Sequence, residues 1–337
     1  MIRYKLLQLM LLLGFPLLVW SCGRDKKTEE DKSNKGIINP VLDINFPDPT
    51  VIKVGDNYYA YATNTYYKNK NYNIPVAVST DLKTWRVSGD ALPKKPDWAT
   101  KDFWAPHVLF DSKLNKYVMF YSGELGPNTG KCIGVAFSNT PEGPFTDSGT
   151  PIISGTGFIN IDPFAFIDPK TGKKLLYWGS DSKPIKVQEL TDDWKAFLPG
   201  SVAKDVIPTG KEAKYDRLVE GAWVDYQDGK YYMYYSGDNC CGAGASYAVL
   251  VARADDAFGP FQRYGEANGT GSSVILEKDT KWMATGHNSI FRDGGGTAYI
   301  AYHALPVNQT TGKAVGTDRQ MLINKIEYVN GWPKVIK

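Results

Sequence analysis

The stretch "DPTVIKVGDNYYAYAT", residues 48–63, joins an apolar strand to a tyrosine-rich strand, and it decides the fold because the same pair recurs. Four further pairs follow at intervals of roughly 60 residues, a period typical of repeat architectures. The leading apolar strands begin at Asp48, Ala105, Asp162, Glu220 and His287. The second strands read "NYYAYAT", "KYVMFYSG", "KLLYWGS", "KYYMYYSG" and "TAYIAYHA". The chain is therefore built from ordered copies of one unit.

A third strand follows each pair, and an aromatic or Gly-Pro segment closes each unit. These third strands read "IPVAVST", "CIGVAFS", "IKVQEL", "YAVLVAR" and "QMLINKI". Five units of three or four antiparallel strands predict an all-β fold, a five-bladed β-propeller. A β-sandwich also contains many short strands, but it does not contain five ordered copies of one unit. We expect residues 37–337 to form this single domain, with "GIINPVL" before Asp43 packed near its closure.

Several ionisable residues stand at the starts of the leading strands. The first strand of each propeller blade lines the central channel, so these residues should lie at one mouth of that channel. They include Asp48, Asp162, Glu220 and His287, and strand alternation should point His107 the same way. Each acid taken alone is better explained as a turn or loop residue. Like charges around a narrow opening repel each other, however, so the shared register favours a functional site.

The leading segments carry a family resemblance. Together, "FPDPTVIK", "FWAPHVLF", "IDPFAFID", "VEGAWVDYQDGKYYMYYSG" and "GHNSIFRD" resemble the blade motifs of glycoside hydrolase family 43. Similar members cleave α-L-arabinofuranosides, arabinan or β-xylosides with inversion. The resemblance implies that Asp48 is the general base, that Glu220 is the general acid, and that Asp162 keeps Glu220 protonated and oriented. Inversion needs such a pair, because one carboxylate activates water while a carboxylic acid protonates the leaving oxygen.

The resemblance also implies binding residues. His287 matches a channel histidine that reaches a calcium ion or its water shell in many members, and imidazole is a poor direct ligand for calcium. Calcium, held through water, is the one cofactor that this match suggests. Arg319 in "GTDRQML" matches an arginine near the sugar, with a surface ion pair as the alternative. Phe46, Trp104 and Asn160 precede leading strands and are predicted to contact the sugar, although aromatic residues there also serve as plugs between blades.

The prediction for the substrate is plant cell-wall polysaccharide, cleaved by an exo-acting α-L-arabinofuranosidase. Long loops at the mouth favour a pocket, and the acid reads Glu220-Gly221-Ala222 where arabinanases of the family often read Glu-Ala-Pro. An endo-1,5-α-L-arabinanase and a β-xylosidase are the alternatives within the family. The related fructan hydrolases usually have Arg before the middle-blade aspartate, whereas Ile161 stands here. A non-catalytic glycan-binding surface lipoprotein is the alternative of another class, and the intact acids argue against it.

The amino terminus indicates export. Residues 1–22 read as a signal peptide, with basic residues before an apolar run that Pro16 interrupts. Cys22 resembles the lipidated cysteine of a bacterial lipoprotein box, and an ordinary secretory signal is the alternative. Residues 23–36 are charged and lack aromatics, which predicts a flexible tether. We expect an exported protein that a lipid anchors to the bacterial cell envelope, at the outer membrane.

The charge and the cysteine content limit which binding partners and metal sites we expect. The net charge is +3 and no basic run stands out beyond the tether, so nucleic acid is not an expected partner, and we expect a monomer. Cys132 and the adjacent Cys240 and Cys241 show no zinc-site spacing. Two pairings stay open: a disulfide between the neighbours, or a bridge from one of them to Cys132.

Overall fold

The computed structural model describes residues 36–126, 129–179, 181–242 and 244–337. The predicted signal peptide, Cys22 and all but the last residue of the predicted tether lie outside these residues. Residues 37–337 form one compact unit. Its described part contains five antiparallel sheets, a two-stranded hairpin and a short helix, α1 (Tyr264–Ala267). No helix in the described part of the chain is long and apolar enough to cross a membrane.

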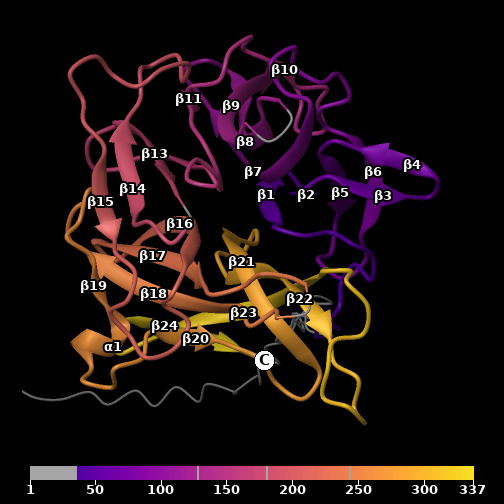
Figure 1. Cartoon of the computed structure of the whole chain (residues 1–337), viewed down its shortest axis with the longest axis vertical. Coiled ribbons are helices and arrows are strands. Elements are labelled where there is room, and N and C mark those ends of the chain that lie inside the picture. Colours follow the sequence, from indigo (N-terminus) through magenta and orange to yellow (C-terminus); the bar gives the residue numbers. More distant parts are fainter. Residues whose placement is uncertain (1–35, 127–128, 180, 243) are drawn as a thin grey trace, which may run out of the picture. The chain divides into compact units, whose positions relative to one another are not determined.

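Each sheet is one blade, and the blades follow one another in a ring (Figure 1). Blade one contains β1 (Thr50–Val54), β2 (Asn57–Tyr61), β5 (Pro75–Ser79) and β6 (Arg86–Asp90). Blade two contains β7 (Lys101–Asp111), β8 (Lys116–Glu124), β9 (Lys131–Ser138), β10 (Thr146–Asp147) and β11 (Ile153–Ser154). Blade three contains β12 (Phe164–Ile167), β13 (Lys174–Trp178), β14 (Ile185–Glu189) and β15 (Lys204–Ile207).

Blade four contains β16 (Val219–Gln227), β17 (Lys230–Gly237), β18 (Ala248–Ala254), β19 (Gln262–Arg263) and β20 (Val274–Leu276). Blade five contains β21 (Trp282–Arg292), β22 (Ala298–Pro306), β23 (Gln320–Val329) and β24 (Trp332–Ile336). The hairpin of β3 (Thr65–Tyr67) and β4 (Lys70–Tyr72) extends the loop between β2 and β5. The predicted all-β, five-bladed propeller is confirmed.

The second strand of a blade is buried on both faces, because it has strand neighbours within its sheet and a blade on either side. In β17, every residue after Lys230 is buried. A tight hairpin joins this strand to β16 through Asp228 and Gly229, which have φ angles of 50° and 81°. An Asp-Gly pair suits such a turn, since both central residues need a positive φ. The tyrosine-rich pattern therefore reports packing between blades and not an amphipathic surface.

Both ends of the domain meet in blade five. The carboxy-terminal β24 supplies the outermost strand. Beyond its end, the amino-terminal segment runs along β23, where Leu42 pairs with Met321 and the Asn39 side chain exchanges hydrogen bonds with the backbone of Ile323. The prediction that "GIINPVL" packs near the closure is confirmed, because these contacts tie the first segment to the last blade.

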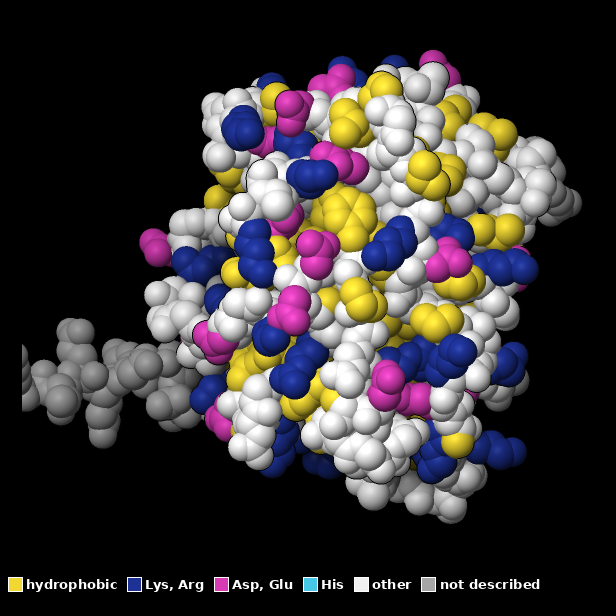
Figure 2. Space-filling view, turned by 90° about the vertical axis from the view of Figure 1, so that its left-hand side faces the viewer, with side chains coloured by type: hydrophobic (Ala, Val, Ile, Leu, Met, Phe, Trp, Pro, Cys, Tyr) yellow, Lys and Arg dark blue, Asp and Glu magenta, His cyan; other side chains and the backbone are white. Residues whose placement is uncertain are grey.

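The outer surface carries mixed charge. On the face shown in Figure 2, Lys and Arg side chains are interspersed with Asp and Glu around scattered hydrophobic groups. Charge on this face is spread out and does not gather into a patch of one sign.

Candidate active site

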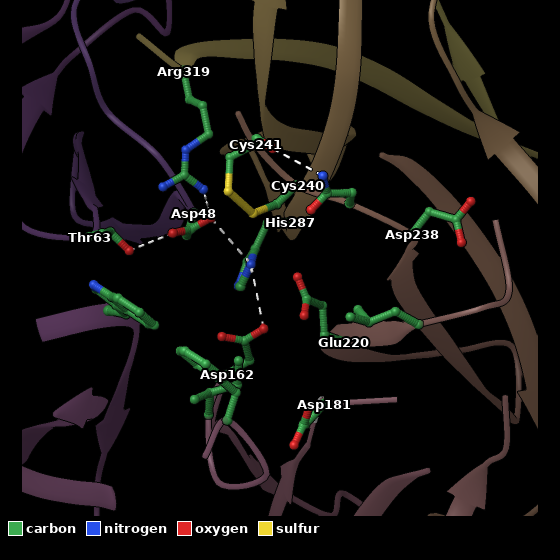
Figure 3. Close-up of a pocket in the computed structure, with 15 residues that line it drawn as sticks. Asp48, Thr63, Asp162, Asp181, Glu220, Asp238, Cys240, Cys241, His287 and Arg319 are labelled. Carbon is green, nitrogen blue, oxygen red and sulfur yellow. Dashed lines mark hydrogen bonds and ion pairs between the residues drawn. A yellow bond between two sulfur atoms is a disulfide. The ribbon is translucent and has the colours of Figure 1, made fainter. Parts of the chain in front are cut away.

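A cavity of about 370 Å³ opens where the innermost strands begin (Figure 3). Strand starts and the loops between second and third strands line it together. The innermost strands β7, β16 and β21 contribute Trp104, Glu220 and His287, and Asp48 and Asp162 lie just before β1 and β12. The loops contribute Thr63, Asp181, Asp238, Asn239, Cys240, Cys241 and Arg319. Residues from all five blades therefore meet in one cavity, and the predicted acids are among them.

The innermost strands share a backbone kink at their mouth ends. Asp48, Ala105, Asp162, Gly221 and His287 have positive φ angles between 43° and 61°. Residues other than glycine seldom adopt this conformation, so it needs external support. Four of these backbone N–H groups donate to a side chain of the preceding blade, namely His303, Thr63, Ser122 and Ser236. In blade four the kinked residue is Gly221, so Glu220 lies one position earlier than the comparison of the repeats predicted.

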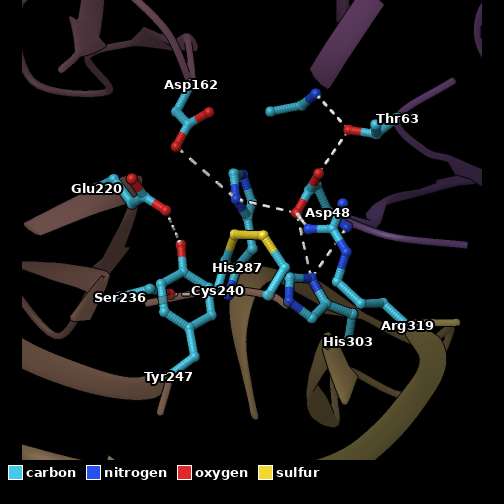
Figure 4. Close-up of polar contacts among 12 residues, drawn as sticks. Asp48, Thr63, Asp162, Glu220, Ser236, Cys240, Tyr247, His287, His303 and Arg319 are labelled. Carbon is cyan, nitrogen blue, oxygen red and sulfur yellow. Dashed lines mark hydrogen bonds and ion pairs between the residues drawn. A yellow bond between two sulfur atoms is a disulfide. The ribbon is translucent and has the colours of Figure 1, made fainter. Parts of the chain in front are cut away.

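Asp48 is buried among polar side chains (Figure 4). Thr63 donates its hydroxyl to Oδ2, and Arg319 lies 3.0 Å from Oδ1. His287 Nδ1 and His303 Nδ1 lie 3.3 and 3.2 Å from the same Oδ1. Burial alone would raise the pKa of Asp48, but Arg319 and the two imidazoles outweigh burial and hold the pKa well below its usual value. Asp48 is therefore ionised at neutral pH.

The two histidines that face Asp48 are neutral at pH 7. Burial lowers the pKa of His303 to about 4, and burial also lowers the pKa of His287. The positive charge that Asp48 faces at neutral pH therefore belongs to Arg319.

Glu220 and Asp162 form a second acidic group. The Tyr247 hydroxyl donates a hydrogen bond of 2.6 Å to Oε1 of Glu220, and all three side chains are buried. Burial and the charges of Glu220 and Asp48 raise the pKa of Asp162 well above its usual value, although the Gly221 N–H bonds to it. Because Asp162 is buried and the charge of Glu220 repels its own, this pair of carboxyl groups retains a proton, which the raised pKa of Asp162 assigns to the Asp162 site. The cavity thus holds an ionised carboxylate at Asp48 and a protonated pair at Asp162 and Glu220.

His287 lies between these two groups. Its Nδ1 is 3.3 Å from Asp48 Oδ1 and 3.8 Å from Asp162 Oδ2 (Figure 4). Gly221 packs against the imidazole, and a Cβ at that position would lie 3.3 Å from the ring. The ring is therefore confined, and it separates the ionised acid from the protonated pair.

Trp104 and Phe158 form an apolar part of the lining. Their rings stack in parallel with centroids 6.1 Å apart, and Phe158 is 49% exposed. The Lys131 ammonium lies 4.1 Å from the Trp104 ring centroid and forms ion pairs of 2.5 Å with Asp102 and Glu124. An exposed aromatic face suits the carbon face of a sugar ring. The structure therefore places Trp104, one of the predicted sugar contacts, on the cavity wall.

Three other predicted residues lie elsewhere, which corrects those expectations. Phe46 is fully buried in the core cluster at the blade closure. Asn160 is buried, and its Oδ1 accepts a hydrogen bond from Trp178 Nε1. His107 packs against two aromatic rings deeper among the innermost strands, where burial lowers its pKa to about 3. Interior packing engages each of these side chains, so none of them lines the cavity.

Three residues that contact the acids were not predicted. Thr63 and His303 occupy the seventh position of "NYYAYAT" and "TAYIAYH", where Ser122 and Ser236 stand in blades two and four. A comparison of that position across the repeats could have identified them. Tyr247 stands in an ordinary third-strand sequence, and no pattern distinguishes it from the other core tyrosines.

The cysteine pair forms part of the cavity wall. Cys240 and Cys241 are joined by a disulfide, and Cys132 is buried and free. The structure therefore decides between the two pairings that the sequence left open.

The residues around His287 do not fit a calcium ion bound directly by the protein. Calcium takes six to eight oxygen ligands. Within the described ranges, no three His, Cys, Asp or Glu side chains gather as a metal set. Asp48 and Asp162 face the imidazole instead. A hydrated calcium stays a prediction, which metal analysis of the purified protein would test, and no chemical step below depends on it.

Comparison with known proteins identifies the family. Residues 37–333 match the model of glycosyl hydrolases family 43. The chain belongs to this family. The family-43 domain is 33% identical to the β-D-galactofuranosidase xynD of Aspergillus niger, over 82% of this chain and 79% of that protein. It is 27% identical to the extracellular endo-α-(1→5)-L-arabinanase 1 of Bacillus subtilis, over 85% of this chain and 86% of that protein.

A crystal structure of a thermostable family-43 glycoside hydrolase superposes with a TM-score of 0.73 and 29% identity, covering 90% of this chain and 96% of that one. This family-43 protein is therefore an enzyme that hydrolyses O-glycosyl bonds.

Proposed function

We propose that this family-43 enzyme hydrolyses α-L-arabinofuranosides with inversion, using Asp48 as the general base and Glu220 as the general acid. The observation that carries the proposal is that one cavity holds three buried carboxyl groups in two different surroundings. Asp48 is held ionised beside Arg319, while Asp162 and Glu220 retain a proton. Inverting hydrolysis needs one carboxyl group in each state at the start of the reaction.

In the proposed reaction, Asp48 takes a proton from a water molecule as that water attacks the anomeric carbon. Glu220 gives its proton to the glycosidic oxygen, and the bond between that oxygen and the anomeric carbon breaks. We propose that Asp162 and Glu220 share one proton, which burial and the repulsion between the two carboxyl groups retain, and that Glu220 carries this proton when the glycosidic bond breaks. Tyr247 fixes the direction of the Glu220 side chain. Arg319 and His287, which flank Asp48 in the cavity, are positioned to contact sugar hydroxyl groups.

The choice of substrate is supported by the relatives. The Bacillus subtilis relative is an arabinanase, and the Aspergillus niger relative acts on galactofuranosides, so both names specify a five-membered sugar ring. We propose plant arabinan or another arabinose-containing polysaccharide as the natural substrate. Exo-action on chain ends or side branches is the finer proposal, because Trp104, Phe158 and Cys241 form walls of the cavity that holds the acids. Endo-arabinanase and β-xylosidase activities are the outcomes that would replace it.

A galactofuranosidase is the second candidate, and the 33% identity to the Aspergillus niger enzyme favours it. β-D-Galactofuranose has the ring configuration of α-L-arabinofuranose with a larger exocyclic group. The same acids could therefore act on both sugars, and the cavity walls would decide between them.

Proton NMR of the anomeric signal during hydrolysis tests the proposal. We would test wild type, Asp48→Ala and Glu220→Ala. Each enzyme is given three aryl substrates, an α-L-arabinofuranoside, a β-D-galactofuranoside and a β-D-xyloside. We expect the arabinofuranoside to be cleaved fastest, the inverted sugar to appear first, and both variants to lose this activity. Initial release of the retained anomer would contradict the mechanism. Faster cleavage of another glycoside would replace the proposed glycone, and cleavage only within linear arabinan would indicate endo-action.

We also propose that the enzyme is exported and anchored through a lipid on Cys22, on the strength of the sequence motif alone. Growth of an expressing bacterium with labelled palmitate tests this. Label in wild type and its loss in Cys22→Ser would support the anchor, whereas an unlabelled secreted protein would indicate an ordinary signal peptide.

A further inference from the structure

The Cys240–Cys241 disulfide lies in the loop that joins β17 to β18, on the wall of the cavity that holds the acids. In both close-ups the sulfur–sulfur bond lies between the side of Asp48 and Arg319 and the side of Glu220 (Figures 3 and 4). Cys240 is half-buried and Cys241 is exposed. The disulfide therefore presents one edge to the space in which a sugar would meet the acids.

A stabilising role explains this bond poorly. A disulfide stabilises a protein mainly by closing a long loop in the unfolded chain, and this one joins neighbours. It ties no distant segments together. Its physical effect is local, since the small ring that it closes removes backbone freedom from two adjacent residues of the cavity wall.

Contacts with the protein interior and hydrogen bonds within the loop hold the loop around the disulfide in place. Cys240 packs against a buried cluster that includes Tyr247, the residue that donates to Glu220. The Asn239 side chain donates to the Cys241 carbonyl, and the Ser246 N–H donates to the Asn239 carbonyl. The two sulfur atoms are therefore fixed relative to the catalytic acid as well as to each other.

The chemistry of the edge suits the carbon face of a sugar. A disulfide carries no N–H or O–H group, and its sulfur atoms are soft and polarisable. The same loop carries Asp238 and Asn239 on the cavity wall, which supply polar groups for hydroxyls. One short loop thus offers an apolar edge flanked by hydrogen-bonding groups, which is the combination that fixes the orientation of a small polar ligand.

We propose that the Cys240–Cys241 disulfide is a specificity-determining wall of the cavity, packing against the carbon face of the sugar beside Asp48 and Glu220. The inference rests on the proposed function as a furanosidase. The oxidised pair sets the width of the cavity at the sugar. Reduction to two thiols opens the small ring and releases the wall, which weakens binding of the sugar without removing any group that transfers a proton.

Reduction of the wild-type enzyme tests the wall. A phosphine such as tris(2-carboxyethyl)phosphine gives two electrons to the disulfide, yields two thiols and becomes its oxide by taking oxygen from water. On an aryl α-L-arabinofuranoside, we expect KM to rise about fivefold on reduction while kcat changes less than about twofold, the pattern of lost ground-state binding. The double variant Cys240→Ser with Cys241→Ser should show the raised KM with or without the phosphine. Its melting temperature, measured alongside, should match that of wild type.

Each of the other possible results contradicts the proposed role of the disulfide in a different way. An equal KM in oxidised wild type, reduced wild type and the double variant would show that sugar does not contact the disulfide. A lower kcat and melting temperature at constant KM would assign the bond a structural role. If the enzyme cleaves furanosides equally well with and without the disulfide, this inference alone is wrong. If the oxidised enzyme neither cleaves furanosides nor binds arabinooligosaccharides, the proposed function is wrong, and the inference is wrong with it.

Discussion

The Tyr247 hydroxyl donates a hydrogen bond of 2.6 Å to Oε1 of Glu220, from the residue just before the third strand of blade four to its first strand. Burial and the neighbouring carboxylates raise the pKa of Tyr247 well above its usual value, so the hydroxyl keeps its proton at every working pH. The catalytic acid is therefore oriented by a neutral donor. The direction of the Glu220 side chain is thus a property of strand packing in blade four.

Replacement of Tyr247 by Phe should lower kcat about 10- to 100-fold with little change in KM. Glu220 becomes a carboxylate as it gives up its proton, and a hydrogen bond to a charged group contributes about 1.5–3 kcal/mol. Each 1.36 kcal/mol corresponds to a factor of ten in rate. Steady-state kinetics on an aryl furanoside checks this. Tyr302→Phe is the matched control, because its hydroxyl bonds to Asn324 and not to an acid, and it should keep kcat within about twofold. Equal losses in both variants would show that the effect is general destabilisation.

Removal of the Arg319 charge should move the acid limb of the pH profile. Activity is lost as the pH falls through the pKa of Asp48, and Arg319 is the strongest of the groups that lower this pKa against the effect of burial. In Arg319→Gln we expect the acid limb of kcat/KM to move to higher pH by about one unit. Arg319→Lys, which keeps the charge, should move it less. If neither substitution moves the acid limb, Arg319 does not control the ionisation of Asp48.

Asp162→Asn should stabilise the protein at neutral pH while lowering its activity. The folded protein holds a proton at the Asp162 site that the unfolded chain releases above about pH 4, so stability falls as the pH rises from there through the raised pKa of Asp162. Asn carries no proton to lose. We expect a melting temperature about 2 °C above wild type at pH 7, a gap that closes below pH 4, and kcat lowered about 100-fold.

Thermal unfolding followed by circular dichroism at several pH values checks the Asp162 prediction. Asp90→Asn is a control outside the cavity, and its melting temperature should not rise at pH 7, because Asp90 accepts backbone hydrogen bonds from Asn73 and Ile74. A lower melting temperature for Asp162→Asn at pH 7 would contradict the assignment of a retained proton to this site.

Gly286→Ala should impair catalysis through Tyr247. A Cβ at Gly286 would lie 2.1 Å from a Tyr247 ring atom, so the ring must move and its bond to Glu220 must weaken. We expect kcat to fall at least about tenfold. Gly295→Ala is the matched control on the turn between β21 and β22, where the nearest atom, of Asp293, lies 3.4 Å away, an ordinary contact. Unchanged kinetics in Gly286→Ala would show that Tyr247 is not confined from this side.

The repeat alone predicted the blades. The strands that begin near Asp48, Asp162 and His287 could be predicted from "DPTVIKV", "DPFAFID" and "HNSIFRD", because period-two patterning and turn residues are local properties. The gathering of Asp48, Asp162 and Glu220 also followed, since propeller topology brings equivalent positions to one mouth. The disagreement over Glu220 arose because an error of one residue hardly changes the spacing of the repeats, so the spacing did not reveal that the kinked residue is Gly221.

Only the tertiary structure decided which neighbours each acid has. Phe46 and Trp104 occupy similar places in the sequence, yet Phe46 fills the core at the closure while Trp104 lines the cavity. His303 reaches the acids from a second strand and Tyr247 from the residue just before a third strand. Local patterns do not report contacts between segments far apart in sequence. The sequence by itself determined the repeat, the blades and the mouth at which the acids gather. The protonation states depend on burial and on distances across blades, which exist only after the ring has closed.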